Sequence, residues 1–238
     1  MPTKKRAPKP HRDADPPADL RIIGGSMRGR KLTYGAHEAA DGSMVTRPMK
    51  HRVRECIFNL ISTESKGRHA IDLFAGTGAL GLEALSRGAP TATFVEKHVP
   101  SARVVQANID ALQVADRCEL LTTSAFLWGQ RDLPNAEFGI AHAESEAEEP
   151  EIRNPQSAIP WLVFCSPPYA FYIDRADDML TLITAVYNRA PQGSILLVEA
   201  DERFDFQQLP ADDWDVRTYP PAVVGVLRKT ASAPEQPS

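Results

Sequence analysis

The stretch HAIDLFAGTGALGLEALSRG, from His69 to Gly88, decides the fold. A short apolar run containing Asp72 leads into the glycine turn Gly76-Thr77-Gly78, and apolar residues then recur at helical spacing. This order predicts a buried strand, a tight turn and a helix, which together form the first half of a βαβ unit. Glycine suits the turn because its backbone adopts positive φ and lets a ligand approach the free N–H groups of the helix.

The segments downstream repeat the alternation of strand and helix. Apolar runs predict strands at 91–96, 118–123, 161–165 and 194–200, helices at 98–112 and 174–190, and an antiparallel pair at 214–221 and 222–230. The sequence therefore predicts an α/β fold with a mostly parallel, twisted sheet, helices on both faces and an antiparallel C-terminal strand pair. Residues 137–158 are acidic and aperiodic, which predicts a flexible insertion, and residues 231–238 are predicted to be a disordered tail.

Length and composition exclude several classes of protein. The 238 residues, 42% of them hydrophobic, suit one α/β domain with a small addition. No apolar run approaches the roughly 20 residues of a membrane span, and the first residues lack the apolar core of a secretory signal. The three cysteines and six histidines show no metal-binding spacing. These features predict a cytoplasmic protein with no metal and no membrane association.

Positive charge is concentrated at the N-terminal end. Residues 1–54 hold 13 Lys and Arg against 5 Asp and Glu, whereas the remainder of the chain holds 14 against 26. A basic arm on an acidic body is typical of proteins that bind polyanions. Residues 1–12 alone are better interpreted as a soluble tail, but the basic residues of 21–54 lie among structure-forming ones.

This basic region divides into a tail and an extension. Residues 1–19 are predicted to be disordered, and residues 20–62 to form a small β-hairpin around Gly24-Gly25 followed by a helix that starts near Pro48. Val53, Ile57, Leu60 and Ile61 form the apolar stripe of that helix. We interpret the extension as an RNA-binding element, and the residues predicted to contact phosphates are Arg28, Arg30, Arg47, Lys50, Arg52 and Arg54.

Several polar segments follow predicted strands and should converge on one crevice, because ligands of open parallel sheets bind beyond the carboxyl ends of the strands. They are the glycine turn, Glu96, Ser124 and the segment Ser166 to Tyr169. The first of these matches GxGxxG, with Glu96 about 20 residues on, which predicts an adenosine-containing cofactor without saying which one.

The segment Ser166-Pro167-Pro168-Tyr169 predicts a slot for an amino group on a planar base. Two consecutive prolines give a stiff backbone with no N–H donors, which leaves carbonyl oxygens to accept hydrogen bonds. A hydroxyl before them adds an acceptor, and the aromatic ring after them can stack on a base. The alternative interpretation, a rigid exit from a strand, is the weaker one in this position.

These segments also resemble a known family. DLFAGTG (72–78), FVEK (94–97) and SPPY (166–169) resemble, in order and spacing, the motifs of class I S-adenosylmethionine-dependent amino-methyltransferases. More narrowly, RIIGGSMRGRKL (21–32), TRPMKHRVRECIFNLI (46–61) and DLFAGTGALGLEALSRGA (72–89) resemble the bacterial 16S ribosomal RNA guanine-N2 methyltransferase family, the RsmD-like family. The family usually has Asp where this chain has Ser166, and commonly Thr where it has Met49.

The resemblance implies a Rossmann-like methyltransferase domain at 63–230 that uses S-adenosyl-L-methionine and transfers methyl to guanine N2. It also implies a monomer whose partner is 16S rRNA or an assembling small ribosomal subunit. The residues expected to bind the cofactor are Asp72, Phe74, Ala75, Gly76, Thr77, Gly78, Leu80, Glu96, Lys97, Ser124 and Ala125. The residues expected in the catalytic slot are Ser166, Pro167, Pro168 and Tyr169.

Three alternatives remain open at this stage. The acceptor could be another amino group, adenine N6 or cytosine N4, in RNA or DNA. Because Ser166 replaces the usual acid, the chain could instead be a catalytically impaired nucleic-acid-binding homologue. The literal GxGxxG also allows an NAD-dependent dehydrogenase, although Pro167-Pro168-Tyr169 has no role in one.

Overall fold

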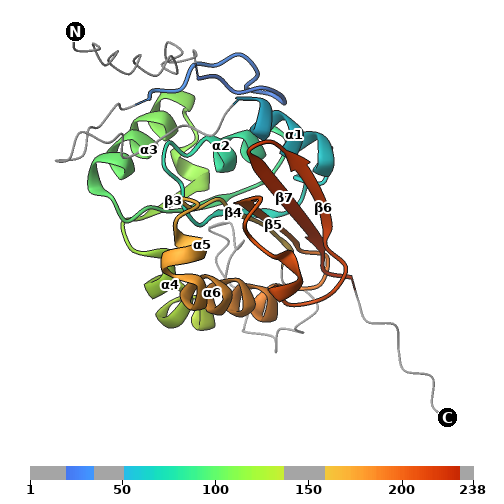
Figure 1. Cartoon of the computed structure of the whole chain (residues 1–238). Helices are drawn as coiled ribbons and strands as arrows, with labels where there is room; N and C mark the ends of the chain where they lie inside the picture. Colours follow the sequence, from blue (N-terminus) through green and yellow to red (C-terminus); the bar gives the residue numbers. More distant parts are fainter. Residues whose placement is uncertain (1–19, 35–50, 137–158, 231–238) are drawn as a thin grey trace, which may run out of the picture.

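The computed structural model of the chain describes residues 20–34, 51–136 and 159–230. In these residues a seven-stranded sheet has the order β3-β2-β1-β4-β5-β7-β6 (Figure 1). Strands β1 to β5 are parallel, whereas β7 runs antiparallel to both β5 and β6. The predicted fold class is confirmed. The predictions for 1–19, 35–50, 137–158 and 231–238 lie outside the described residues.

The strands form close to the apolar runs that predicted them. Their bounds are β1 (His69–Asp72), β2 (Ala92–Val95), β3 (Cys118–Leu121), β4 (Trp161–Cys165), β5 (Ile195–Asp201), β6 (Asp215–Tyr219) and β7 (Ala222–Arg228). Strands β1, β2 and β4 are buried along their whole length, as expected for parallel strands covered on both faces.

The helices lie in two layers, one on each face of the sheet (Figure 1). One layer holds α1 (His51–Ile61), α2 (Ala79–Ser86) and α3 (Val99–Leu112), and the other holds α4 (Ala125–Arg131), α5 (Phe171–Asp174) and α6 (Ala176–Arg189). Short 3₁₀ turns occur at Ala115–Arg117, Leu133–Asn135 and Phe206–Gln208. The helix predicted at 174–190 is divided because Arg175, at φ −139°, leaves the helical range between α5 and α6.

Alternate residues of each central strand belong to different cores. In β4, Leu162 and Phe164 pack in the core beneath α1, α2 and α3, whereas Trp161, Val163 and Cys165 pack in the core beneath α4 and α6. This is the period of two that a strand buried on both faces requires. The sheet is therefore held rigidly from both sides, which fixes the positions of the strand ends.

Residues 20–34 form a loop that folds back on itself. A β-hairpin was predicted, but only one antiparallel bridge forms, between Arg21 and Lys31. Ile22 N–H donates to the Arg30 carbonyl at 3.0 Å. The loop lies against the end of α2 so closely that a Cβ on Gly25 would lie 1.9 Å from the Ser86 carbonyl oxygen. Gly25 also has φ 76°, so glycine is required there.

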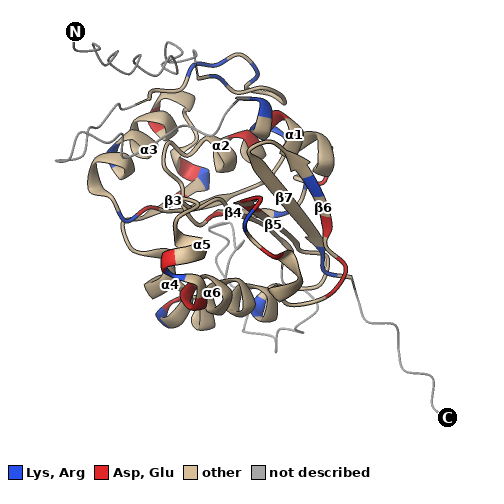
Figure 2. Ribbon diagram, viewed as in Figure 1, with Lys and Arg blue, Asp and Glu red and all other residues tan. Residues whose placement is uncertain are grey.

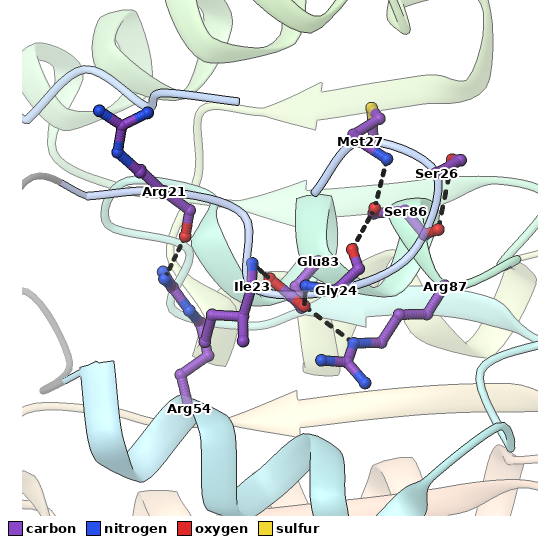
Figure 3. Close-up of polar contacts among 9 residues, drawn as sticks. All are labelled: Arg21, Ile23, Gly24, Ser26, Met27, Arg54, Glu83, Ser86 and Arg87. Carbon is purple, nitrogen blue, oxygen red and sulfur yellow. Dashed lines mark hydrogen bonds and ion pairs between the residues drawn. The ribbon is translucent and has the colours of Figure 1, made fainter. Parts of the chain in front are cut away.

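A buried carboxylate anchors this loop to the α/β fold (Figure 3). Glu83 of α2 has no exposed surface, and its oxygens accept the N–H groups of Ile23 and Gly24, each at 2.7 Å. Arg87 Nε donates to the same carboxylate at 2.8 Å. Ser86 adds a bond from Met27 N–H at 2.9 Å. Two successive turns of α2 thus hold the loop through its backbone.

Candidate active site

The turn after β1 forms a cradle of backbone at the carboxyl edge of the sheet. Gly76 and Gly78 have φ values of 56° and 77°, which side chains disfavour. A Cβ on Gly81 would lie 2.4 Å from Phe94 Cε1 of β2, so the third glycine permits close helix–sheet packing. The glycines of the motif are therefore required for two reasons, positive φ at Gly76 and Gly78 and close packing at Gly81, and they leave the turn open to a ligand.

Asp72 is a buried carboxylate beside this cradle. Its Oδ2 accepts the Gly81 N–H at 3.3 Å, while its Oδ1 is buried with no hydrogen-bond partner among the described residues. Burial raises the pKa of Asp72 to about 7, partly offset by the Gly81 N–H and reinforced by the charge of Glu96. A buried acceptor without a partner is costly, and a cationic ligand group would satisfy it.

Glu96 follows β2 and is linked to the same turn. One carboxylate oxygen accepts the Gly76 N–H at 2.8 Å and the other accepts the His98 N–H at 2.7 Å. Each carboxylate oxygen has two lone pairs, so both retain capacity for ligand hydroxyl groups. Glu96 can therefore hold the glycine turn in place and bind a ligand at once.

The other predicted cofactor residues lie in the turn, at the start of α2 or in the segments that follow β2 and β3. Ala75 N–H donates to the Val95 carbonyl at 3.1 Å, and the Thr77 carbonyl accepts a bond from the buried Asn108 at 2.9 Å. Leu80 and Ala125 are buried, Ser124 is half-buried at the start of α4, and Lys97 is exposed. Asn108 was not predicted, because a single polar residue in a helix carries no sequence signal of its own.

Phe74 lies in a cluster of aromatic rings that joins three strand ends. Its ring centroid is 5.9 Å from that of Phe126 and 6.1 Å from that of Phe171. The Arg175 guanidinium lies 3.7 Å from the centre of the Phe126 ring. The cluster connects the turn after β1 with the segments after β3 and β4, so it fixes the spacing of these three segments.

The segment Ser166 to Tyr169 leaves β4 beside the cradle that follows β1, because β4 pairs with β1 through Asp72 and Phe164. Ser166 Oγ and Tyr169 OH both donate to the side chain of Glu199, the latter at 2.6 Å. The Pro168 carbonyl accepts the Phe171 N–H at 2.9 Å, so among the two proline carbonyls that of Pro167 remains the predicted acceptor. The slot predicted from the sequence thus contains a carboxylate that was not predicted.

Glu199 comes from the neighbouring strand, β5. Val198 pairs with Cys165, which places the next residues of the two strands, Glu199 and Ser166, at the same edge. The Glu199 side chain is buried, with 6% of its surface exposed. One signal could have revealed it: the run SILLVEA holds a single charge inside an otherwise apolar strand, and buried charges require partners.

The predicted phosphate-contacting residues have different environments. Arg28, Arg30 and Arg52 are exposed, whereas Arg47 and Lys50 lie outside the described residues. Arg54 is fully buried, and its Nη2 donates to the Arg21 carbonyl (Figure 3). Desolvation lowers the pKa of Arg54, with Glu83 opposing the shift. Because Arg54 has no exposed surface, the prediction that it contacts RNA phosphates is wrong.

Known proteins resemble this chain in sequence and in fold. Residues 20–142 match the family described as "Conserved hypothetical protein 95". The chain is 30% identical over 193 residues to YlbH of Bacillus subtilis, provisionally named an rRNA methyltransferase, covering 81% of this chain and 89% of that protein. It is 35% identical over 116 residues to ribosomal RNA small subunit methyltransferase D of Escherichia coli, covering 49% and 56%. The chain belongs to the RsmD-like family.

Solved structures share the fold of this RsmD-like chain. An Escherichia coli protein provisionally named methyltransferase yhhF has a TM-score of 0.63 at 24% identity, covering 90% of this chain and 99% of that one. An RNA methyltransferase from Salinibacter ruber, solved with S-adenosyl-L-homocysteine, has a TM-score of 0.50 at 14% identity, covering 80% and 98%. The predicted enzyme class and cofactor are confirmed: the chain is a methyltransferase that uses S-adenosylmethionine.

The residues present fit this cofactor. The unpartnered Asp72 oxygen can accept from its ammonium group, the glycine turn can admit its chain, and Glu96 can accept from its ribose hydroxyls. Bound there, S-adenosylmethionine supplies an electrophilic methyl group. The individual contacts of the eleven predicted residues stay predictions.

The described residues contain neither a membrane-spanning helix nor a cluster of metal ligands. No helix in them is long and apolar enough to cross a membrane. No group of three or more His, Cys, Asp or Glu side chains in them could hold a metal ion.

Replacing Glu96 with alanine should weaken S-adenosylmethionine binding by at least about tenfold, because hydrogen bonds to a charged group contribute roughly 1.5–3 kcal/mol. The variant also loses the bonds that hold Gly76 and His98. Isothermal titration calorimetry gives the affinity, with Asp116→Ala, which removes an exposed acid before β3, as the matched control. Unchanged affinity in Glu96→Ala would remove Glu96 from the cofactor site.

Proposed function

We propose that this RsmD-like enzyme transfers a methyl group from S-adenosylmethionine to the exocyclic N2 amino group of a guanine in 16S rRNA of the small ribosomal subunit. One observation carries the proposal: the segment Ser166 to Tyr169 leaves β4 next to the strand whose end forms the cofactor cradle. An acceptor-rich slot and a methyl donor are thereby predicted side by side. Membership of the RsmD-like family sets aside the NAD-dependent dehydrogenase.

The slot suits an amino acceptor for a chemical reason. The lone pair of an exocyclic amino group is delocalised into the ring, so the nitrogen attacks only when its N–H groups are held by acceptors that favour a pyramidal geometry. Ser166 Oγ and the Pro167 carbonyl are the proposed acceptors, and the Tyr169 ring is the proposed stacking surface. Positioning the nitrogen about 3–3.5 Å from the methyl carbon supplies much of the acceleration. The target base must be unpaired or leave its stack to enter.

The names of the relatives and the charge of the extension support rRNA as the substrate. YlbH and methyltransferase D are both named for rRNA. Figure 2 shows the positions of Lys and Arg residues, in blue on the ribbon, along the 20–34 loop and at the start of α1, on the side of the sheet that also carries α2 and α3. Exposed arginines on a docked loop are suited to phosphate contacts, which position RNA without reading its sequence.

Reversing the charges of Arg28 and Arg52 together should flatten the salt dependence of RNA binding. Each lost phosphate contact lowers the slope of log K against log salt by about 0.7 for single strands and about 0.9 for duplexes. Fluorescence anisotropy over a series of salt concentrations measures the slope. Arg131→Glu, an exposed arginine of α4 on the opposite face, is the matched control. An unaltered slope in the double variant would count against the extension as the RNA surface.

Methyl transfer tests the proposed function itself. Tritiated S-adenosylmethionine is incubated with the full chain and with small ribosomal subunits, free 16S rRNA, 23S rRNA or duplex DNA, the RNAs coming from cells without the protein. We expect label in 16S rRNA or in the small subunit and none in 23S rRNA or DNA. Label in DNA, or no label anywhere despite measurable cofactor binding, would overturn the proposal in favour of another substrate or an impaired homologue.

A further inference from the structure

The Glu199 carboxylate borders the proposed amino slot and accepts hydrogen bonds from both hydroxyl groups of the slot. Ser166 Oγ and Tyr169 OH each donate to a different oxygen of the carboxylate. Tyr172 OH donates to the backbone carbonyl of Glu199 at 3.0 Å, so the main chain of the same residue is also held. Glu199 is buried and makes no ion pair with any Lys, Arg or His of the described residues.

This arrangement determines what the serine can do. A hydroxyl has one hydrogen and two lone pairs, and the hydrogen of Ser166 is directed to Glu199. Only lone pairs therefore remain to meet an N–H group entering the slot. A hydroxyl that donates to a carboxylate is also a stronger acceptor, because hydrogen bonds in a chain polarise one another. Serine alone would be a weak neutral acceptor.

We propose that Glu199 is the positioning carboxylate of the amino slot: it orients Ser166 as an acceptor and takes up, through Ser166, the proton that the nitrogen releases. The inference rests on the proposed function, because it requires an exocyclic nitrogen as the methyl acceptor. In this chain a carboxylate of β5, Glu199, thus takes the acidic role that Ser166 cannot perform because it has no carboxylate.

The step balances in atoms and charge. The nitrogen lone pair forms the new N–C bond, and the C–S bond breaks with its electron pair left on the former sulfonium sulfur. The nitrogen becomes positively charged and gives one proton to Ser166 Oγ, which passes its own hydrogen to the Glu199 carboxylate. The protonated Glu199 then returns the proton to solvent, so that the dyad is restored for the next turnover.

Glu199→Gln is the first variant, because it preserves the shape of the side chain and removes the carboxylate. We expect kcat to fall about 100-fold, a typical contribution of general acid–base groups. The KM for RNA and the affinity for S-adenosylmethionine should change little. Glu202→Gln, which removes an exposed charge three residues further on, should keep the wild-type kcat.

Two further variants separate this role from a merely structural one. Ser166→Ala combined with Glu199→Gln should be no slower than Ser166→Ala alone, because both changes interrupt one relay. Ser166→Asp combined with Glu199→Gln should recover at least about tenfold of the lost kcat, because it places a carboxylate in the slot directly. Thermal unfolding checks that each variant is folded.

The outcomes distinguish this inference from the proposed function. The wild-type product is identified first, and methyl on an atom other than an exocyclic nitrogen would overturn both. With the wild-type product an N-methylated base, wild-type kcat in folded Glu199→Gln would overturn the role of Glu199 alone. Additive losses in the double variant, or no recovery by Ser166→Asp, would also overturn it.

Discussion

Asp72→Asn is expected to weaken S-adenosylmethionine binding by about 10- to 100-fold, because it removes a charge that should face the ammonium group of the cofactor. Wild-type affinity should also fall as the pH drops through about 7, since Asp72 then gains a proton and its charge is lost. Calorimetric titration between pH 5.5 and 8.5 measures both effects. The asparagine variant should show no such loss from this group.

The same substitution should stabilise the ligand-free protein at high pH. The pKa of Asp72 is about 7 when folded and 3.8 ordinarily, so between these values the folded state binds more protons than the unfolded state. Stability from this group is therefore lost as the pH rises from about 4 to 7 and stays lost above it. At pH 8 the free energy of unfolding of Asp72→Asn should exceed that of wild type by at most about 4 kcal/mol.

Urea unfolding without cofactor at pH 5 and at pH 8 measures this difference. An advantage of Asp72→Asn that grows with pH is the predicted result. An advantage that is equal at both pH values, together with unchanged cofactor affinity, would contradict the role assigned to Asp72.

Glu83→Ala is expected to destabilise the fold by about 3–5 kcal/mol, the usual cost of removing one member of a buried charged network. The N–H groups of Ile23 and Gly24 would lose their acceptor, and Arg87 and the buried Arg54 would lose the nearby negative charge. The 20–34 loop should separate from α2 first, so RNA affinity should fall at temperatures where the fold remains intact.

The matched control is Glu64→Ala. Glu64 also accepts from an arginine, Arg228 Nη2 at 2.7 Å, but the two side chains are 32% and 40% exposed. Partly exposed pairs contribute about 1 kcal/mol or less, so this variant should change the free energy of unfolding only slightly. Equal losses of unfolding free energy in the two variants would show that the burial of Glu83 does not increase its contribution to stability.

The order of strands and helices could be predicted from the sequence because the apolar runs are long enough to fix strand positions. The motif around the glycine turn also predicted its own geometry, since positive φ at Gly76 and Gly78 is a local requirement. The pairing of the 20–34 loop with α2 could not be predicted in the same way. It depends on Glu83, whose partners lie about 60 residues away in the chain.

Arg54 shows where the interpretation by residue type failed. It was assigned to RNA because it is basic and lies in a basic segment, yet Arg54, Ile57, Phe58 and Ile61 have the spacing of one helix face. That face is buried against the fold. The spacing contained the correct answer, but it was outweighed by the charge of the side chain.

Glu199 shows the complementary failure. The strand 194–200 was predicted, and its one charged residue was treated as part of the strand and given no role. Its two side-chain hydrogen-bond donors, Ser166 and Tyr169, come from the segment that follows the neighbouring strand β4, and strand neighbours cannot be read from the sequence of either strand alone. Which polar groups meet in the slot therefore depends on the order of the strands in the sheet.

The identity of the methylated nucleoside tests the account most directly. Small ribosomal subunits from cells without the protein are incubated with the wild-type chain and S-adenosylmethionine. The 16S rRNA is digested to nucleosides, and the products are separated by chromatography and identified by mass spectrometry. The account predicts N2-methylguanosine, absent when the protein is omitted. N6-methyladenosine or N4-methylcytidine would contradict guanine as the acceptor, and no methylated nucleoside with cofactor bound would contradict catalysis by this site.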